Sequence, residues 1–185
     1  MRLFVSVDLD PLADALRDAQ QPLADADDLR LTDPEQAHLT LSFLGEVPEA
    51  RVPSVAAALR DAVAAAGVGP FDVHLGGYGV FPSPAYISVV WVGVREGNER
   101  LTRLHEAIES RLADLGFAPE DHEFTPHVTV ARMDDAGGKS RVQRIVRERD
   151  PDVGRLRVEA VRLTESRLTS SGPVHETVEV VDLRE

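Results

Sequence analysis

The sequence predicts a fold that mixes α-helices with β-strands and forms two similar halves within one domain. Segments with the period of a strand alternate with segments that have the period of a helix. The motif His-x-Thr occurs once in each half, at His38–Thr40 and at His127–Thr129. Hydrophobic residues make up 43% of the 185 residues and are spread along the chain, enough for one well-filled core. No linker rich in glycine or serine divides the halves, so we expect a single domain over residues 1–185.

The first half is predicted to run strand, helix, strand, helix. Residues 2–9, "RLFVSVDL", and residues 37–45, "AHLTLSFLG", have the pattern of strands. Apolar residues at helical spacing predict a helix over residues 12–26. The alanine-rich stretch 49–67 predicts a second helix, which Gly67 closes.

The second half is predicted to repeat a related order over residues 86–149. Two strands, 71–81 and 85–94, are joined by the proline-rich "PSP" and precede a helix at 98–116. A strand at 127–133 and a helix at 139–149 follow, and two runs, 155–168 and 174–183, are rich in strand-forming residues. This order indicates an internal duplication with one His-x-Thr strand in each half.

Charge and cysteine content exclude several kinds of protein. The formal net charge of -12 argues against a protein that coats duplex nucleic acid, because that binding depends on cationic contacts to phosphates. A small electropositive cleft can still exist inside an acidic shell. Of the 20 basic residues only Lys139 is a lysine, and many acids with few lysines suggest a salt-adapted protein. The absence of cysteine excludes disulfides, thiolate zinc sites and a cysteine nucleophile.

The sequence contains no segment that predicts export or membrane insertion. No apolar run approaches the roughly 20 residues that a bilayer requires, and two aspartates interrupt the opening "MRLFVSVDLD". We therefore expect a cytoplasmic protein, and a monomer is the simplest expectation for two lobes that close on each other.

The two His-x-Thr motifs place matching side chains on one face of each strand. Side chains alternate along a strand, so His38 and Thr40 share a face while Leu39, Leu41 and Phe43 point to the core. His127 and Thr129 share a face in the same way. If the two strands lie side by side, two imidazoles and two hydroxyls meet in a common cleft.

This set of groups suits the cleavage of a phosphodiester without a metal ion. The reaction needs a base for the attacking water, an acid for the departing oxygen, and donors for the charged phosphate oxygens. Histidine, with an ordinary pKa of about 6.5, can be either base or acid near neutral pH. The threonine hydroxyls supply the donors. From the residues alone, the two histidines are equivalent.

Simpler interpretations exist for single residues of this kind. One histidine on a strand is more often structural than catalytic, but random placement gives two such pairs only in roughly a few per cent of cases. His74, His105 and His122 lack the threonine and are predicted to be structural or surface residues. A zinc site at His38 and His127 is disfavoured, because each motif supplies one good ligand. Tyr78 and Phe81 are expected in the core, with base stacking as the alternative.

The residues around both motifs resemble a known family. The matching segments are "RLFVSVDL", "PEQAHLTLSFLGEV", "GYGVFPSP", "WVGV", "GFAPEDHEFTPHVTVAR" and "LTESRLTSSGPVHE". Two such motifs in a chain of this size are similar to the 2H phosphoesterase superfamily, and the flanks resemble its RNA 2′,3′-cyclic phosphodiesterase family, first described as 2′-5′ RNA ligase.

The resemblance implies a fold, a reaction and roles for the motif residues. The fold is a two-lobed α+β fold with duplicated β-α-β-α-β units and antiparallel sheets flanking a central cleft, without a cofactor or metal. The reaction is hydrolysis of a 2′,3′-cyclic phosphate at an RNA end to a 2′-phosphomonoester, with reverse 2′-5′ ligation as a further activity. His38 would be the proton donor and His127 the proton acceptor, while Thr40 and Thr129 would bind the phosphate.

Two further residues are singled out by comparison with the family. Arg132 stands where the family often has an arginine, but strict alternation puts it on the face opposite His127. It reaches a phosphate only if the strand twists, bulges or ends, and a surface ion pair is the alternative. Members often carry an aromatic before the first motif and a tyrosine near the C-terminus. This chain lacks the former, and His175 replaces the latter.

Two other functions remain open from the sequence. The chain could bind RNA ends or nucleotides without turnover, although both histidines and both threonines are present. It could also act on small cyclic nucleotides or on an ADP-ribose cyclic phosphate. In the leading interpretation the substrate is instead an RNA with a 2′,3′-cyclic phosphate end, and a tRNA fragment is one such RNA. Tight binding without product would identify the non-catalytic binder. Relative rates on oligonucleotides and mononucleotides would identify the small substrate.

Overall fold

The computed structural model describes residues 1–184, which form nine strands, four α-helices and four short 3-10 helices. The strands are β1 (Arg2–Asp8), β2 (Leu29–Leu31), β3 (His38–Glu46), β4 (Phe71–Ser83), β5 (Tyr86–Glu96), β6 (His127–Met133), β7 (Asp152–Val158), β8 (Ala160–Thr169) and β9 (Gly172–Asp182). The α-helices are α1 (Ala13–Gln20), α2 (Val52–Ala66), α3 (Asn98–Asp114) and α4 (Lys139–Glu148), and the 3-10 helices are η1 (Asp10–Leu12), η2 (Gln21–Leu23), η3 (Pro34–Gln36) and η4 (Glu49–Arg51).

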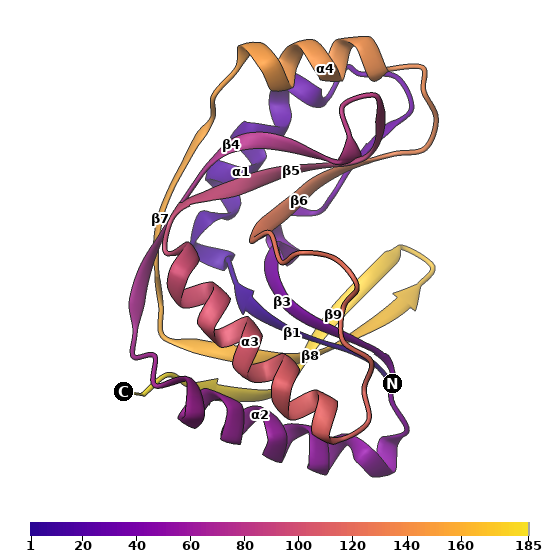
Figure 1. The fold of residues 1–185 in the computed structure, drawn as a ribbon. Helices are drawn as coiled ribbons and strands as arrows, with labels where there is room; N and C mark the ends of the chain where they lie inside the picture. The colour runs from indigo at the N-terminus through magenta and orange to yellow at the C-terminus, as the bar shows by residue number, and fades with distance from the viewer. Residues whose placement is uncertain (185) are drawn as a thin grey trace.

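The strands form two antiparallel sheets. The four-stranded sheet has the order β3-β1-β8-β9, and the five-stranded sheet has the order β2-β6-β5-β4-β7. In Figure 1 the ribbon has the outline of a C, with the four-stranded sheet below and β4, β5 and β6 above. Strand β3 of one sheet contacts β6 of the other, so the two motif strands meet between the sheets.

The helices link the two halves of the chain. Helices α2 and α3 pack on each other, α2 contacts β9, and α3 contacts β3 of the four-stranded sheet. Helix α1, from the first half, instead contacts β6 and β7 of the five-stranded sheet, and α4 contacts β4. Each sheet therefore receives a helix from the opposite half of the chain, and the halves are interleaved.

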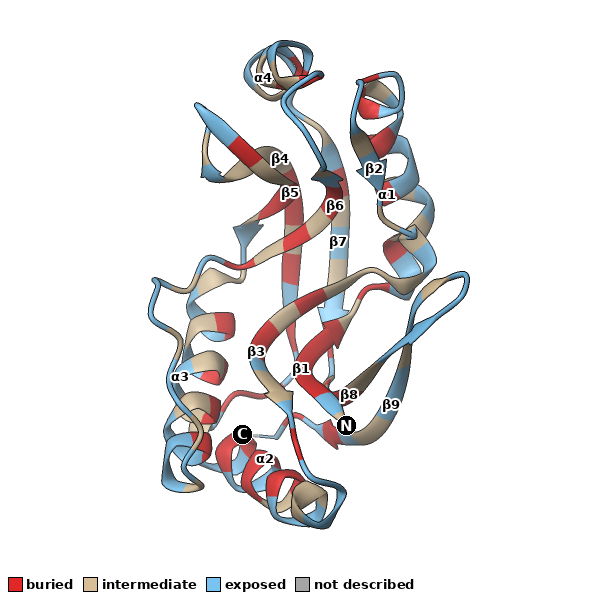
Figure 2. Ribbon diagram, turned by 90° about the vertical axis from the view of Figure 1, so that its right-hand side faces the viewer, coloured by how far each residue is buried: buried red, intermediate tan, exposed pale blue. Residues whose placement is uncertain are grey.

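One hydrophobic core runs through both sheets. It includes side chains of β1 and β3 as well as of β4, β5 and β6, and of all four helices. Buried and partly exposed positions alternate at the start of β3 and of β6, whereas β1 is buried over most of its length (Figure 2). This alternation reflects the two-residue period of a strand. The buried side chains of the motif strands pack into the hydrophobic core.

Most predicted elements are present, with three differences in their boundaries. The first helix ends at Gln20 rather than at residue 26, because Pro22 follows and the chain continues as the 3-10 helix η2. The short strand β2 was not predicted; its three residues pair with the end of β6. The run 155–168 forms two strands, β7 and β8, that belong to different sheets and divide at Glu159. No helix among the described residues is long and apolar enough to span a bilayer.

Candidate active site

The two motif histidines are held in the same way at the first residue of their strands. Nδ1 of His38 lies 3.2 Å from the carbonyl oxygen of Gln36, and Nδ1 of His127 lies 2.7 Å from that of Thr125. A carbonyl oxygen only accepts, so Nδ1 carries the hydrogen in both rings. The Nε2 atom of each ring is consequently the proton acceptor in the neutral state, and each is available to a substrate.

Each motif strand contains a bulge directly after its threonine. Thr40 pairs with Ser6 and Ser42 with Val5, which leaves Leu41 without a partner on β1. In β6, Thr129 pairs with Trp91 and Ala131 with Val90, so Val130 is the extra residue. A bulge inserts one residue into a strand and interrupts the alternation of its side chains.

The bulge in β3 corrects the predicted orientation of Phe43. Leu39 and Leu41 are buried as predicted, but Ser42 is also buried, and Phe43 is 63% exposed. The extra residue shifts the alternation by one position, so Phe43 returns to the face of His38. Strict alternation had placed this ring in the core, and that prediction was wrong.

The bulge in β6 has the same effect on Arg132. Val130 and Ala131 are consecutive buried residues, and Arg132 is exposed. The guanidinium forms no ion pair with any of residues 1–184, and its charge lowers the pKa of both His38 and His127. Arg132 therefore lies within electrostatic reach of both imidazoles, and the ion-pair alternative is not observed.

Two side chains from crossing helices bind the carbonyl groups of the bulges. Gln20, a buried residue of α1, donates through Nε2 to the carbonyl oxygen of Val130 at 2.9 Å. His105 of α3 makes the equivalent contact, with Nδ1 at 2.7 Å from the carbonyl oxygen of Leu41. The carbonyl oxygen of Val130 also accepts from the backbone N–H of Thr32 at 3.0 Å, so Gln20 adds a second donor there. On β3, His105 binds the carbonyl of a residue that has no partner on β1.

The motif threonines have free hydroxyl groups. Thr40 and Thr129 are partly buried, and neither hydroxyl hydrogen-bonds to another group within residues 1–184. A partly buried hydroxyl without a protein partner is available to an external acceptor. Together with Arg132, the two hydroxyls can bind the oxygens of an anion.

Burial lowers the pKa of three imidazoles at this site. The pKa of His38 falls to about 4, mainly because burial disfavours its charged form, and His175, His127 and Arg132 lower it further. Burial also lowers the pKa of His127 and of His175, against the opposing effects of the Thr125 and Gln36 contacts. Without an anion, all three rings are predominantly neutral at pH 7.

His175 lies beside His38 and is connected to it through Gln36. The two rings are 4.9 Å apart, with an edge-to-face arrangement. The side-chain oxygen of Gln36 accepts from the backbone N–H of His175 at 3.0 Å, and its Nε2 donates to the carbonyl of Pro173 at 3.1 Å. Gln36 thus joins the β8–β9 hairpin to the segment that orients His38.

Aromatic rings surround both motif histidines. Phe4 lies 4.6 Å from His38 and also contacts His175 and Phe43. At the other motif histidine, the ring of Phe81 on β4 lies 4.9 Å from the ring of His127, edge to face. Phe81 is partly exposed and belongs to this site rather than to the core where we had expected it. Tyr78 packs against the core as predicted, and its hydroxyl donates to the carbonyl of Ala19.

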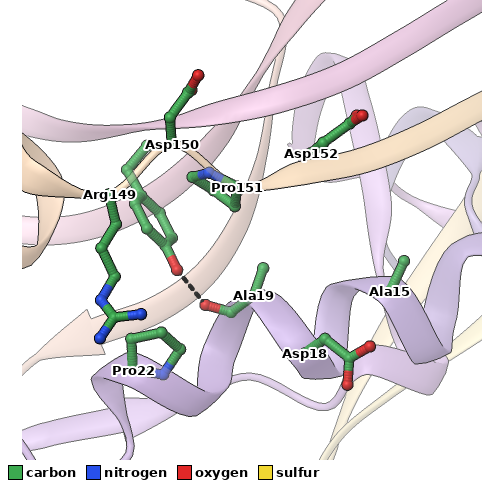
Figure 3. A pocket seen from close by; sticks show the side chains of 9 residues that line it. Ala15, Asp18, Ala19, Pro22, Arg149, Asp150, Pro151 and Asp152 are labelled. Atoms are coloured by element: carbon green, nitrogen blue, oxygen red, sulfur yellow. Dashed lines mark hydrogen bonds between the residues drawn. The ribbon is translucent and has the colours of Figure 1, made fainter.

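A separate pocket between α1, the middle of β4 and the segment that enters β7 does not have the character of an anion site (Figure 3). Its volume is about 370 Å³, and three aspartates and a single arginine, Arg149, line it. Two of these aspartates already have partners, since Asp150 pairs with Arg95, and Asp152 lies 2.6 Å from Nε2 of His74. The groups suited to phosphate are on β3 and β6.

Comparisons with known proteins agree with this fold. Residues 6–169 match the sequence model of the 2′-5′ RNA ligase superfamily. A protein of Methanothermobacter thermautotrophicus called RNA 2′,3′-cyclic phosphodiesterase is 36% identical over 186 residues, covering 99% of each chain. The crystal structure of TT0787 of Thermus thermophilus has a TM-score of 0.81 at 30% identity, and covers 100% of this chain and 98% of that one. E. coli LigT, solved with 3′-AMP, shares the fold with a TM-score of 0.79 at 22% identity over 100% and 98% of the two chains.

An α+β fold whose two antiparallel sheets each contribute one His-x-Thr strand defines the 2H phosphoesterase class. Within that class, this chain belongs to the 2′-5′ RNA ligase superfamily.

Several residues of the site were not predicted. Phe43 could have been found by placing "HLTLSF" over "HVTVAR", which aligns it with Arg132. Gln20, Gln36 and Phe4 have no local signal, because their contacts join segments that are distant in the sequence.

Proposed function

We propose that this protein hydrolyses 2′,3′-cyclic phosphates at RNA ends and leaves a 2′-phosphomonoester. The observation that carries the proposal is the matched pair of imidazoles on adjoining strands, each with Nδ1 bound to a carbonyl and Nε2 available. Free threonine hydroxyls and Arg132 supply donors for the phosphate. Relatives called RNA 2′,3′-cyclic phosphodiesterase that match nearly the whole chain support this substrate class.

The proposed reaction uses the two histidines in opposite protonation states. Nε2 of neutral His127 accepts a proton from water, and the water oxygen attacks phosphorus. The bond between phosphorus and the 3′-oxygen breaks, and His38 delivers the proton from its Nε2 to that oxygen. Thr40, Thr129 and Arg132 stabilise the charge on the non-bridging oxygens. The cycle closes when His127 loses its proton and His38 regains one.

The lowered pKa of His38 has a consequence for this mechanism. A ring with a pKa of about 4 carries almost no proton at pH 7, so the free enzyme lacks its general acid. A bound phosphate anion favours the charged imidazolium and raises the pKa of both histidines. We therefore expect substrate binding to take up a proton from solution.

The proposal also covers the reverse reaction, the range of substrates and the setting in which the protein works. A 5′-hydroxyl in the place of water would give a 2′,5′-phosphodiester, which is the reverse ligation. We propose that the substrates include tRNA fragments or nucleotides, and that a cytoplasmic monomer carries out the reaction. The excess of acidic residues is assigned to a salty environment rather than to the site.

The test is turnover of an oligonucleotide with a 2′,3′-cyclic end in EDTA, at low and at high salt. His38→Ala and His127→Ala are each expected to lower the rate by about 10² to 10⁴-fold, because each removes one partner of the proton transfer. His74→Ala is the matched control, since His74 pairs with Asp152 away from the motif strands. Full retention of the cyclic end by the unmodified protein would exclude the proposal, and tight binding without product would identify an RNA-end binder.

A further inference from the structure

Three potential metal ligands meet at the bulge of β3, and none of them belongs to the two motif strands. They are His105 and Glu109 of α3 and Glu120 of the segment that leads to β6. One ligand atom from each lies within 4.8 Å of the other two. Two ligand atoms bound to one metal ion, each at about 2.0–2.4 Å, can lie as far apart as the sum of the two bonds, so this separation is compatible with a shared ion. His105 and Glu109 are four residues apart on one helix face, a spacing that directs both to a common point.

All three side chains are oriented by the bulge itself. His105 binds the carbonyl oxygen of Leu41 through Nδ1, Glu109 accepts from the hydroxyl of Ser42 at 3.1 Å, and Glu120 accepts from the backbone N–H of Phe43 at 3.3 Å. Metal-binding histidines commonly donate their other ring nitrogen to a backbone carbonyl, and metal-binding carboxylates are similarly hydrogen-bonded. Each candidate ligand thus has an orienting contact and keeps a second polar atom free.

The charges at this cluster are not balanced. Within residues 1–184 neither carboxylate pairs with a lysine or arginine, and the exposed His122 lies 3.8 Å from Glu120. Burial and the neighbouring Glu120 raise the pKa of Glu109. Two partly buried carboxylates without a lysine or arginine partner favour a cation between them.

We propose that His105, Glu109 and Glu120 bind a divalent transition-metal ion, Zn²⁺ or Mn²⁺. One imidazole nitrogen with two carboxylate oxygens suits these ions, whereas Mg²⁺ and Ca²⁺ prefer oxygen ligands alone. The ion would join α3, the bulge of β3 and the segment before His127, and so stabilise the packing of these three segments. Its role is structural, because its ligands lie outside the two motif strands and the ion takes no part in the proton transfers of His38 and His127.

The experiment is calorimetric titration of the EDTA-treated, dialysed full chain with Zn²⁺, Mn²⁺ and Mg²⁺, together with thermal unfolding. Zn²⁺ or Mn²⁺ should bind at one site per chain and raise Tm by about 5 °C when the ion exceeds its Kd 100-fold. Mg²⁺ should produce a smaller shift. Glu109→Gln should weaken binding at least ~30-fold and should not lower Tm without metal, because it removes one of two like charges.

Two further variants make the result decisive. Glu106→Gln removes the same charge from an exposed position of the same helix and should bind the ion as the unmodified chain does. His127→Asn should also bind it normally, whereas an ion held by the imidazoles of the motif strands would be lost. Absence of saturable binding, equal effects of Glu106→Gln and Glu109→Gln, or loss of binding in His127→Asn would overturn the proposal. Because turnover is measured in EDTA, these outcomes are independent of the proposed activity.

Discussion

At the scale of single residues, the two motifs differ most at the position three residues after each threonine. Phe43 follows Thr40 and Arg132 follows Thr129, and both bulges turn these side chains to the face of the histidines. An aromatic ring on the side of His38 and a guanidinium on the side of His127 make the two halves of the site chemically different. The ring offers a surface for a nucleobase, and the guanidinium offers charge for a phosphate.

This difference predicts the effect of changing Arg132. Arg132→Gln should lower kcat/KM by about 10² to 10³-fold, because it removes a cationic donor from the phosphate in a partly desolvated site. Arg132→Lys should restore only part of the rate, since lysine lacks the forked donor geometry. Steady-state kinetics on a cyclic-ended dinucleotide checks both values. Arg144→Gln, on the exposed face of α4, is the control, and equal rates for Arg132→Gln and this control would contradict the assignment.

The residues most readily predicted were those repeated in the sequence. His38, Thr40, His127 and Thr129 form a pattern with a known period, and the period of a strand predicts which pairs share a face. The position of Arg132 required knowledge of the bulge, which depends on pairing with β5. His175 was recognisable only as a departure from a family pattern, because its ring meets that of His38 across 137 positions of the chain, with Gln36 and Phe4 holding the two together.

At the scale of elements, each bulge is completed by a helix from the other half of the chain. Helix α1 supplies Gln20 to β6, and α3 supplies His105 to β3. Helices and strands could be predicted from local periodicity, but this exchange could not, because it follows from how the sheets pack. The same limit explains the missed strand β2, whose three residues are ordered by pairing with β6.

The helix-to-bulge contact predicts a defined effect of Gln20→Leu. The substitution keeps the size of the side chain but removes the donor that binds the carbonyl groups of Thr32 and Val130. Val130 keeps the backbone N–H of Thr32, whereas Thr32 loses its side-chain donor, and the change should cost about 1–3 kcal/mol of unfolding free energy. If the bond also positions Arg132, kcat/KM measured well below Tm should fall about 10-fold, mainly through KM. Denaturant unfolding and kinetics on the same preparation separate the two effects.

The matched control is Gln143→Leu. Gln143 donates to the carbonyl of Pro84 on the exposed surface of the molecule, so this change removes a similar bond away from the bulge. A loss of stability in Gln20→Leu without any change in kcat/KM would show that the bulge keeps its shape without α1.

At the scale of the whole molecule, the site makes folding sensitive to acid. The unfolded chain protonates its histidines near their ordinary pKa of about 6.5, whereas burial lowers the pKa of His38, His127 and His175 in the folded protein. Between these values the unfolded state binds more protons than the folded state, so stability rises with pH and is lost as pH falls. The loss due to His38 begins near pH 6.5 and continues to about pH 4.

The corresponding prediction concerns His38→Asn. Between pH 7 and pH 4 this variant should lose about 3 kcal/mol less unfolding free energy than the unmodified chain does, because it has no buried imidazole at position 38 that can take up a proton on unfolding. Urea unfolding at several pH values in EDTA measures the difference. His122→Asn, at a side chain that is 71% exposed, should run parallel to the unmodified chain.

Inorganic phosphate should reduce the acid loss of the unmodified chain but not of His38→Asn, because a bound anion raises the pKa of the ring that the variant lacks. If phosphate instead protected both chains equally at every pH, the anion would not lie against His38, and the acid role of this residue would have to be withdrawn.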